Sequence, residues 1–428
     1  MRNLLLVLLW LVGAELCAGI PPEELARRRA VVGEGLDSLS ALVMRAAEIR
    51  MRSNDVNYRY RQESNFLYLT GIEKPNCYLV IAPCGIQEGD RTVRIVVFCD
   101  KKNSGEITIP DGLVLDNERF QEVLKSVASR VTTMYMSAPD IKFVNDWLNG
   151  KGVFLDRDVR KTFEQNHPNL KLKNAAQVLT RARGIKSAVE LDQIRTAIRL
   201  TGDGLARAMS ICKPGVYEYE LQAAIEYEMI RRGASYPAFP SIVGSGENSL
   251  DYHYEHNRRC TAGGDLVVMD VGAEFAGYSA DVTRTIPVSG RFTREQREVY
   301  DVVLRAQKAA IAVVRPGLPY RELDRRARGV IDSAGYGKFW GHGVSHHLGL
   351  DTHDAGNMDT LRTGMVITVE PGIYIRRNDT TVAAGYRGFG IRIEDDVLVT
   401  EDGYEVLSAA IPKEAKAVEA LVGRKIRN

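Results

Sequence analysis

The apolar positions in the first half of the chain follow two different periods. Short apolar, β-branched runs at 77–82 and 93–99 predict strands. Apolar residues spaced as on one face of a helix predict helices over 28–47, 118–130 and 141–148. This mixture predicts a small α/β domain.

The second half of the chain predicts long helices and separate strands. Ser187 with Glu190, and Thr293 with Gln296, each have the capping-box spacing that opens a helix. Further helices are predicted over 219–232 and 320–334, and strands over 265–275, 278–286, 365–370 and 388–400. Helices beside a largely antiparallel sheet make an α+β arrangement. We therefore expect one domain over 20–183 and a second over 184–428, divided at the basic segment 181–186.

Residues 1–19 have the pattern of a secretory signal peptide. A short basic start is followed by the apolar run 4–14 and by small residues at Ala18 and Gly19. The run is shorter than the ~20 residues that span a membrane, and an uncleaved anchor or a buried N-terminal helix are the alternatives. We expect an exported protein, periplasmic or secreted, if the segment is cleaved, and a cytoplasmic one otherwise. Membrane contact is expected only if the segment stays uncleaved.

Composition and charge exclude several classes of protein. The 57 basic and 55 acidic residues leave a net charge of +2, which gives no basic surface for nucleic acid or an anionic membrane. Six cysteines are too few for a disulfide scaffold. Removal of the N-terminal segment would leave five, and the sequence does not tell which of them pair.

Two aspartates of a predicted hairpin indicate metal chemistry. If Ala276 and Gly277 form its turn, Asp281 lies opposite Gly272, and Asp270 shares their face of the sheet. The aspartates are then diagonal neighbours, roughly 7–8 Å apart at the backbone. Their charges repel unless a cation lies between them, and Gly272 would leave room for it. The alternative is a solvated aspartate on an exposed face, although Asp270 ends an apolar run.

Histidines and glutamates extend this acidic pair. Six of the seven histidines lie between residues 253 and 353, and four of these fall within the glycine-containing segment 342–353. Glu370 and Glu394 stand at the ends of strand-like runs. Two aspartates, two glutamates and a histidine form an oxygen-rich set that suits two divalent cations, with manganese first and cobalt, iron or zinc as alternatives.

Five motifs resemble those of the pita-bread metallopeptidases, the family of creatinase, prolidase and methionine aminopeptidase, and most closely aminopeptidase P. The motifs are segment 242–248, the aspartate pair with Thr283-Arg284-Thr285, His342-Gly-x-Ser-His346-x-Leu-Gly, Val369-Glu-Pro-Gly372 and Arg392-Ile-Glu-Asp395. Segment 55–71 is similar to the N-terminal domain of that enzyme. The resemblance implies an α+β fold, with a C-terminal pita-bread catalytic domain and a mixed α/β, creatinase-like N-terminal domain.

Carried onto this sequence, the resemblance implies roles for individual residues. The ligands of a dinuclear site would be Asp270, Asp281, His346, Glu370 and Glu394, with Asp281 and Glu394 bridging both ions. The catalytic residues would be His253, His342, His353 and Glu370, and the substrate-binding residues His342, Tyr374 and Arg392. His347 stands where the family usually has an aromatic residue, often Trp. The spacing of Ser345-His346-x-Leu-Gly favours His346 as the ligand.

The resemblance also implies an activity, which is removal of the N-terminal residue from peptides with proline in the second position. A hydroxide bridging the two ions would attack the carbonyl before proline. His353 would stabilise the oxyanion, and Glu370 would pass a proton to the prolyl nitrogen. Proline-containing peptides are the expected partners. The relatives imply a homo-oligomer, either a dimer or a tetramer.

Two other functions fit the same motifs. A proline dipeptidase (prolidase) shares the five ligands and the fold, but Tyr236-Pro-Ala-Phe followed by 242–248 is more similar to aminopeptidase P. A creatinase-like hydrolase, or a pseudoenzyme kept as a binding module, would work without metal. Such relatives lose some ligands, whereas all five are present here. The preferred first residue, the peptide length and the physiological substrate stay open.

Overall fold

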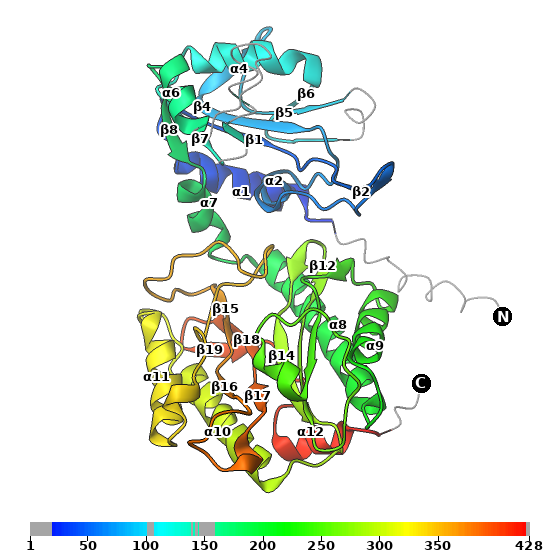
Figure 1. Cartoon of the computed structure of the whole chain (residues 1–428). Helices are drawn as coiled ribbons and strands as arrows, with labels where there is room; N and C mark the ends of the chain where they lie inside the picture. Colours follow the sequence, from blue (N-terminus) through cyan, green and yellow to red (C-terminus); the bar gives the residue numbers. More distant parts are fainter. Residues whose placement is uncertain (1–18, 101–106, 138–139, 142–143, 145–158, 425–428) are drawn as a thin grey trace, which may run out of the picture.

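The chain forms two bodies, which lie one above the other in Figure 1. The computed structural model describes residues 19–100, 107–137, 140, 141, 144 and 159–424. Most of the predicted signal peptide and most of the helix predicted over 141–148 therefore lie outside the described residues. Within the part of the chain that is described, no helix is long and apolar enough to span a membrane.

A six-stranded mixed sheet forms the centre of the N-terminal body. Its strands, in spatial order, are β6 (Leu113–Asp116), β5 (Arg91–Cys99), β4 (Tyr78–Glu88), β1 (Ser40–Arg45), β7 (Thr133–Met136) and β8 (Lys171–Asn174). β4 pairs antiparallel with β1 and β5, and the other three pairings are parallel. The two predicted strands are confirmed, and so is the mixed α/β character of this half.

The helix predicted over 28–47 is wrong in its second half. The helix α1 (Pro22–Glu34) stops at Gly35, and residues 40–45 form β1 in the middle of the sheet. Ala41 and Val43 pack on one face of the sheet and Leu42 and Met44 on the other. A strand buried on both faces loses the alternation of apolar and polar residues, so periodicity cannot separate it from a buried helix.

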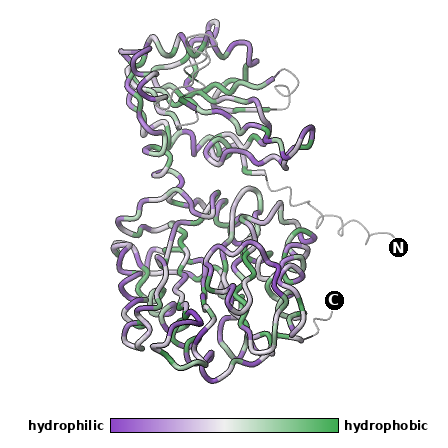
Figure 2. The backbone as a smooth tube through the Cα atoms, in the orientation of Figure 1, coloured by the Kyte–Doolittle hydropathy of each residue, from purple (hydrophilic) through white to green (hydrophobic). Residues whose placement is uncertain are grey.

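Helices cover both faces of this sheet. Phe120, Val123, Leu124 and Val127 of α4 (Phe120–Ala128) pack on one face, and α1 with α2 (Ser64–Thr70) packs on the other. The body also contains α6 (Val159–Asn166), α7 (Ala176–Arg183) and the small hairpin of β2 (Met51–Ser53) and β3 (Val56–Asn57). Figure 2 shows apolar stretches along the strands of the sheet. A disulfide between Cys77 and Cys99 links β4 to β5.

The C-terminal body combines long helices with small antiparallel sheets. Its helices are α8 (Ala188–Ile211), α9 (Glu218–Arg231), α10 (Arg294–Ile311), α11 (Arg321–Ser333) and α12 (Ala415–Leu421). Its strands are β9 (Tyr236–Pro237), β10 (Ile242–Ser245), β11 (Leu266–Val271), β12 (Ala273–Phe275), β13 (Tyr278–Ser279), β14 (Val282–Pro287), β15 (Val366–Val369), β16 (Gly372–Ile375), β17 (Phe389–Arg392), β18 (Asp395–Val399) and β19 (Tyr404–Val406). The two predicted capping boxes are confirmed, at the starts of α8 and α10.

The predicted hairpin has the predicted register. Phe275 pairs with Tyr278 and Asp270 with Thr283, which places Asp281 opposite Gly272. The expectation that Gly272 leaves room for a cation is wrong. A Cβ at position 272 would lie 1.8 Å from the carbonyl oxygen of Ala280, so glycine is required by the close approach of the hairpin backbone.

Buried polar contacts join the two bodies. Arg28 of α1 donates to the hydroxyl of Tyr278 at 3.0 Å, and that hydroxyl donates to Glu190 of α8 at 3.1 Å. The side chain of Ser187, which caps α8, donates to Glu24 of α1 at 2.8 Å. The start of α8 is therefore anchored in both bodies. The division between residues 183 and 184 stays a prediction.

Candidate metal centre

Four carboxylates and one histidine meet on the inner strands of the C-terminal body. Asp270 lies in β11, and Asp281 precedes β14. Glu394 stands between β17 and β18, and its backbone N–H donates to Thr283 of β14 at 3.1 Å. Glu370 follows β15, beside the irregular segment that carries His346. Residues more than 120 positions apart in the sequence thus contribute to one site.

The side chains approach one another closely enough to share a metal ion. His346 Nε2 lies 3.4 Å from Asp281 Oδ2 and 3.6 Å from Glu370 Oε1. One ligand atom from each of Asp281, His346 and Glu394 lies within 4.8 Å of the others. An imidazole nitrogen surrounded by carboxylate oxygens is a donor set for divalent first-row metals.

Arg392 ties Asp270 to the rest of the site. Its guanidinium donates to Asp270 Oδ2 at 2.6 Å, to Tyr374 Oη at 2.9 Å and to Thr283 Oγ1 at 3.1 Å. Thr283 in turn donates to Glu394 Oε2 at 2.7 Å. The other oxygen of Asp270, Oδ1, is buried and has no hydrogen-bond partner. A buried carboxylate oxygen without a partner is costly, and a bound cation would satisfy it.

Burial and mutual repulsion perturb the acids of the site. Burial, together with the charges of Glu394 and Asp270, raises the pKa of Asp281 well above its ordinary range. Burial and the charges of Glu394 and Asp270 likewise raise the pKa of Glu370 well above its ordinary value, and burial with the charge of Asp270 raises the pKa of Glu394 to about 8. Dications would reverse these shifts by attracting the ionised forms. The residues therefore fit divalent metal.

Two histidines flank the acids as neutral rings. His342 Nε2 lies 2.7 Å from Tyr374 Oη, and its Nδ1 lies 3.6 Å from Glu370 Oε2. The ring of His353 stacks on that of His346, with centroids 4.0 Å apart. Burial lowers the pKa of His342 and of His346 to about 4, and it also lowers the pKa of His353. Near neutral pH these rings can accept or donate one proton each, and His346 can bind a metal.

The chain has close relatives of known type. The model of metallopeptidase family M24 matches residues 192–401, and the model of the aminopeptidase P N-terminal domain matches residues 25–136. The Xaa-Pro aminopeptidase of Haemophilus influenzae is 34% identical over 442 residues, a match that covers 95% of this chain and 98% of that protein. The chain belongs to the aminopeptidase P branch of metallopeptidase family M24.

Solved structures of aminopeptidase P share the whole fold. Aminopeptidase PepP of Pseudomonas aeruginosa superposes with a TM-score of 0.84 at 32% identity, covering 94% of this chain and 98% of that one. Aminopeptidase P of Escherichia coli, solved with the inhibitor Pro-Leu, superposes with a TM-score of 0.83 at 33% identity over the same shares. The predicted α+β fold, with its pita-bread catalytic domain and aminopeptidase P N-terminal domain, is confirmed.

Two other histidines that the sequence singled out differ in their surroundings. His253 is exposed, but it lies near enough for its charge to contribute to lowering the pKa of His342 and of His353. The ring of His347 packs against that of Tyr320, with centroids 5.7 Å apart. It is buried, with Nε2 at 3.1 Å from the carbonyl oxygen of Asn357. This agrees with the choice of His346 as the histidine of the site.

Sequence reasoning missed two residues that shape the site. Tyr252 packs edge-on against the ring of His342 at 5.1 Å and against that of Tyr374 at 4.5 Å. Asp396 is buried and accepts a hydrogen bond from the backbone N–H of Asp281 at 3.2 Å. Tyr252 adjoins the predicted His253, and Asp396 lies two residues after Glu394. The only signal in the sequence that could have pointed to them is their position close to predicted site residues.

Proposed function

We infer that the protein is a metallo-aminopeptidase that removes the N-terminal residue from peptides with proline in the second position. The observation that carries this function is the convergence of Asp281, His346 and Glu394 on one buried point. It occurs in a chain that aligns with Xaa-Pro aminopeptidases over nearly their full length.

Five side chains would hold the metal. These would be Asp270, Asp281, His346, Glu370 and Glu394. Four ionised carboxylates balance two dications, and the oxygen-rich set favours manganese, with cobalt, iron or zinc as alternatives. When bound, such ions supply Lewis-acid polarisation of a carbonyl and lower the pKa of water.

The protein's own groups handle protons and charge. Glu370 would take the proton of the attacking water and pass it to the prolyl nitrogen. The nitrogen of any cleaved peptide bond needs such a proton to leave as a neutral amine, and the prolyl nitrogen, which carries no hydrogen in the peptide bond, leaves as a secondary amine. The His353 ring, beside His346, would donate a hydrogen bond to the developing oxyanion.

Aromatic side chains would bind the proline ring. The rings of Tyr252, His342 and Tyr374 form a wall, with centroids 4.5–5.6 Å apart, that suits an apolar five-membered ring. Arg392 holds the Tyr374 hydroxyl in place. The Escherichia coli relative binds the inhibitor Pro-Leu, which has the form of the product left after the first residue is removed.

Tripeptides separate this activity from that of a proline dipeptidase. The purified protein should release free arginine from Arg-Pro-Pro and should act on longer peptides with proline second. Cleavage confined to Xaa-Pro dipeptides would assign it to the prolidases instead. If the purified protein is folded, binds no metal and cleaves neither substrate, it is a metal-free relative instead.

We also propose export of the mature protein. The support is the basic, apolar and small-residue pattern of residues 1–19. N-terminal sequencing of the protein from its native cell should begin close to residue 20, in a periplasmic or secreted fraction. Recovery of the intact Met1 terminus in the cytoplasm would contradict export.

A homo-oligomer, dimer or tetramer, is proposed for the mature protein. The support is the match to aminopeptidase P over both domains. Light scattering at micromolar concentration should give two or four times the chain mass. A mass equal to that of one chain would contradict the proposal.

A further inference from the structure

The segment 347–354 carries His353 without regular secondary structure. Its first part is tied by backbone hydrogen bonds, from Leu348 N to Val366 O at 3.0 Å and from Ser279 N to Gly349 O at 2.7 Å. Because no helix or strand orients the part that carries His353, the position of that ring depends on side-chain contacts to the segment.

The carboxylate of Asp354, the next residue, is buried between two cations. Lys186 Nζ donates to Asp354 Oδ2 at 2.9 Å, and Arg183 donates to Oδ1. The side chains of Lys186, Asp354 and Arg183 are only 1%, 2% and 3% exposed. Burial alone would raise the pKa of Asp354, but attraction to Lys186 and Arg183 lowers it. The carboxylate is therefore ionised near neutral pH.

The segment is shaped around this carboxylate. A Cβ at Gly349 would lie 2.2 Å from Asp354 Oδ2, so only glycine lets the carboxylate fold back over its own loop. The backbone N–H of Asp354 also donates to His347 O at 2.9 Å. His347 follows His346 directly, so this bond links the residue after His353 to the residue after His346.

The cations reach the segment from the boundary between the two bodies. Arg183 ends α7, and Lys186 lies just before α8. Arg183 donates to Asn65 Oδ1 of α2 at 2.6 Å and to Asp351 Oδ2 at 2.7 Å. The N-terminal body is thus in contact with the loop that carries His353.

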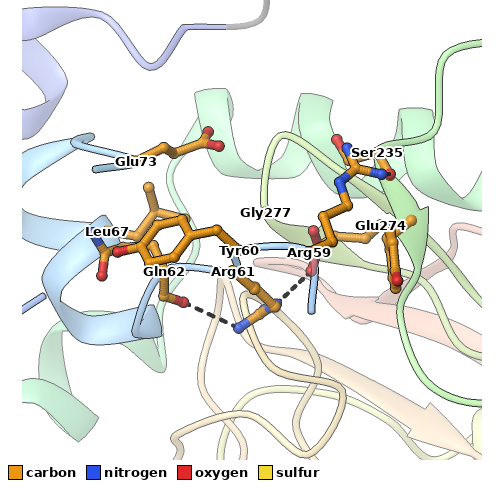
Figure 3. A pocket seen from close by; sticks show the side chains of 10 residues that line it. Arg59, Tyr60, Arg61, Gln62, Leu67, Glu73, Ser235, Glu274 and Gly277 are labelled. Carbon is orange, nitrogen blue, oxygen red and sulfur yellow. Dashed lines mark hydrogen bonds and ion pairs between the residues drawn. The ribbon is translucent and has the colours of Figure 1, made fainter. Parts of the chain in front are cut away.

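A second arginine of the N-terminal body supports the same loop. Arg61 donates to the carbonyl oxygen of Leu350 at 2.6 Å and to Glu274 Oε2 of β12 at 2.6 Å. Figure 3 shows Arg61 beside Gln62 and Glu274 in a cavity of about 130 Å³. At this cavity Arg59 donates to the carbonyl oxygen of Ser235 and Arg61 donates to Glu274, so both arginines hold the two bodies together.

Buried ion pairs add little net stability, because the cost of desolvating the charges offsets their attraction. Their best-attested role is to favour one conformation over its alternatives. We propose that Asp354, held by Lys186 and Arg183, is a positioning residue that fixes His353 over the candidate metal centre. This inference rests on the proposed function, since His353 matters only if peptides are cleaved at this site. Through Arg183, the N-terminal domain would help to order segment 347–354, the loop that carries His353.

A double-mutant cycle tests the proposal. Asp354→Asn keeps the side-chain shape but removes the charge, and it should lower kcat for Arg-Pro-Pro roughly 10- to 100-fold with KM unchanged. In the His353→Ala background, Asp354→Asn should cause no further loss, because it acts through His353. If Asp354→Asn does not fold, Lys186→Gln takes its place in the cycle, with Arg183 left as the partner of Asp354.

Further measurements separate positioning from general damage. In the metal-free protein, hydrogen exchange of segment 347–354 should rise in Asp354→Asn, while α8 and α10 keep their protection. Glu405→Gln, which breaks the exposed pair with Arg195, is the matched control and should leave kcat unchanged. Losses that multiply in the double variant, or wild-type kcat in Asp354→Asn, would overturn the proposal. Absence of cleavage by the wild-type protein would instead overturn the proposed function.

Discussion

At the scale of single residues, the site is a group of buried acids that must lose protons before it can bind metal. Burial and the charge of Asp270 raise the pKa of Glu394 to about 8 from its ordinary value of 4.5. Between these values the folded, metal-free protein holds a proton that the unfolded chain has released. The free energy of unfolding therefore falls as the pH rises through this range.

Thermal unfolding of metal-free protein tests this sign. Its Tm should be lower at about pH 8 than at about pH 5, and Mn²⁺ should raise Tm more at the higher pH, where fewer protons compete for the acids. Glu394→Gln cannot ionise and should reduce the pH dependence. A metal-free Tm that rises toward pH 8 would contradict the account.

Arg392 is expected to support activity through the planar geometry of its guanidinium group as well as through its charge. It contacts Asp270, Tyr374 and Thr283 through three different nitrogens, a geometry that lysine cannot reproduce. Arg392→Lys should lower kcat/KM roughly 10- to 100-fold. Arg377→Lys, at an exposed arginine paired with Glu247, should match the wild type. Equal activity of the two variants would show that charge alone suffices at position 392.

The sequence predicts the acids of the site better than their surroundings. Asp270 and Asp281 follow from the period of a strand and the turn that joins the hairpin, which are local rules. His346, Glu370 and Glu394 depend on the motif resemblance, because no local rule brings separate strands together. Tyr252 and Asp396 could not be selected, since their roles arise from packing between distant segments.

At the scale of elements, the hairpin of β11, β12, β13 and β14 sets the geometry of the aspartates. Its register was predictable because two strand-like runs flank Ala276 and Gly277. In the structure these two residues form the turn, with positive φ of 50° and 82°. The role of Gly272 was not predictable, because the nearby carbonyl of Ala280 is a feature of the folded backbone.

Gly272→Ala should therefore damage the hairpin. The new methyl group would lie 1.8 Å from the Ala280 oxygen, and the free energy of unfolding should fall by roughly 3 kcal/mol, the upper end for overpacking. Denaturant unfolding provides the measurement. Gly329→Ala, in α11 with no atom within 4 Å of the added carbon, should instead be neutral or stabilising by ~0.5–1 kcal/mol. Equal effects would contradict the steric explanation.

Helix α1 and strand β1 show the limit of periodicity within one segment. The apolar residues over 28–47 continue without a clear change of period, yet the chain turns at residues 35–39 and enters the sheet. Capping boxes were more reliable, because each is a local hydrogen-bond exchange that requires no distant partner. Both predicted boxes start helices where expected.

At the scale of the whole molecule, two bodies of different architecture both contact segment 347–354, the loop that carries His353. In the N-terminal sheet, the Cys77–Cys99 disulfide links the start of β4 to the end of its neighbour β5. Replacing both cysteines by alanine should lower the free energy of unfolding by about 2–4 kcal/mol. Denaturant unfolding would measure the loss, and Cys84→Ala, at a free cysteine, provides the control. An unchanged stability would show that the bond contributes nothing.

The account depends most directly on metal-dependent cleavage before proline. The measurement is release of arginine from Arg-Pro-Pro by the purified mature protein, with and without added Mn²⁺, beside Asp270→Ala and Glu394→Ala. We predict release that requires the metal and is lost in both variants while their folds persist. Release that is independent of metal, or that survives in either variant, would contradict the assignment of these acids.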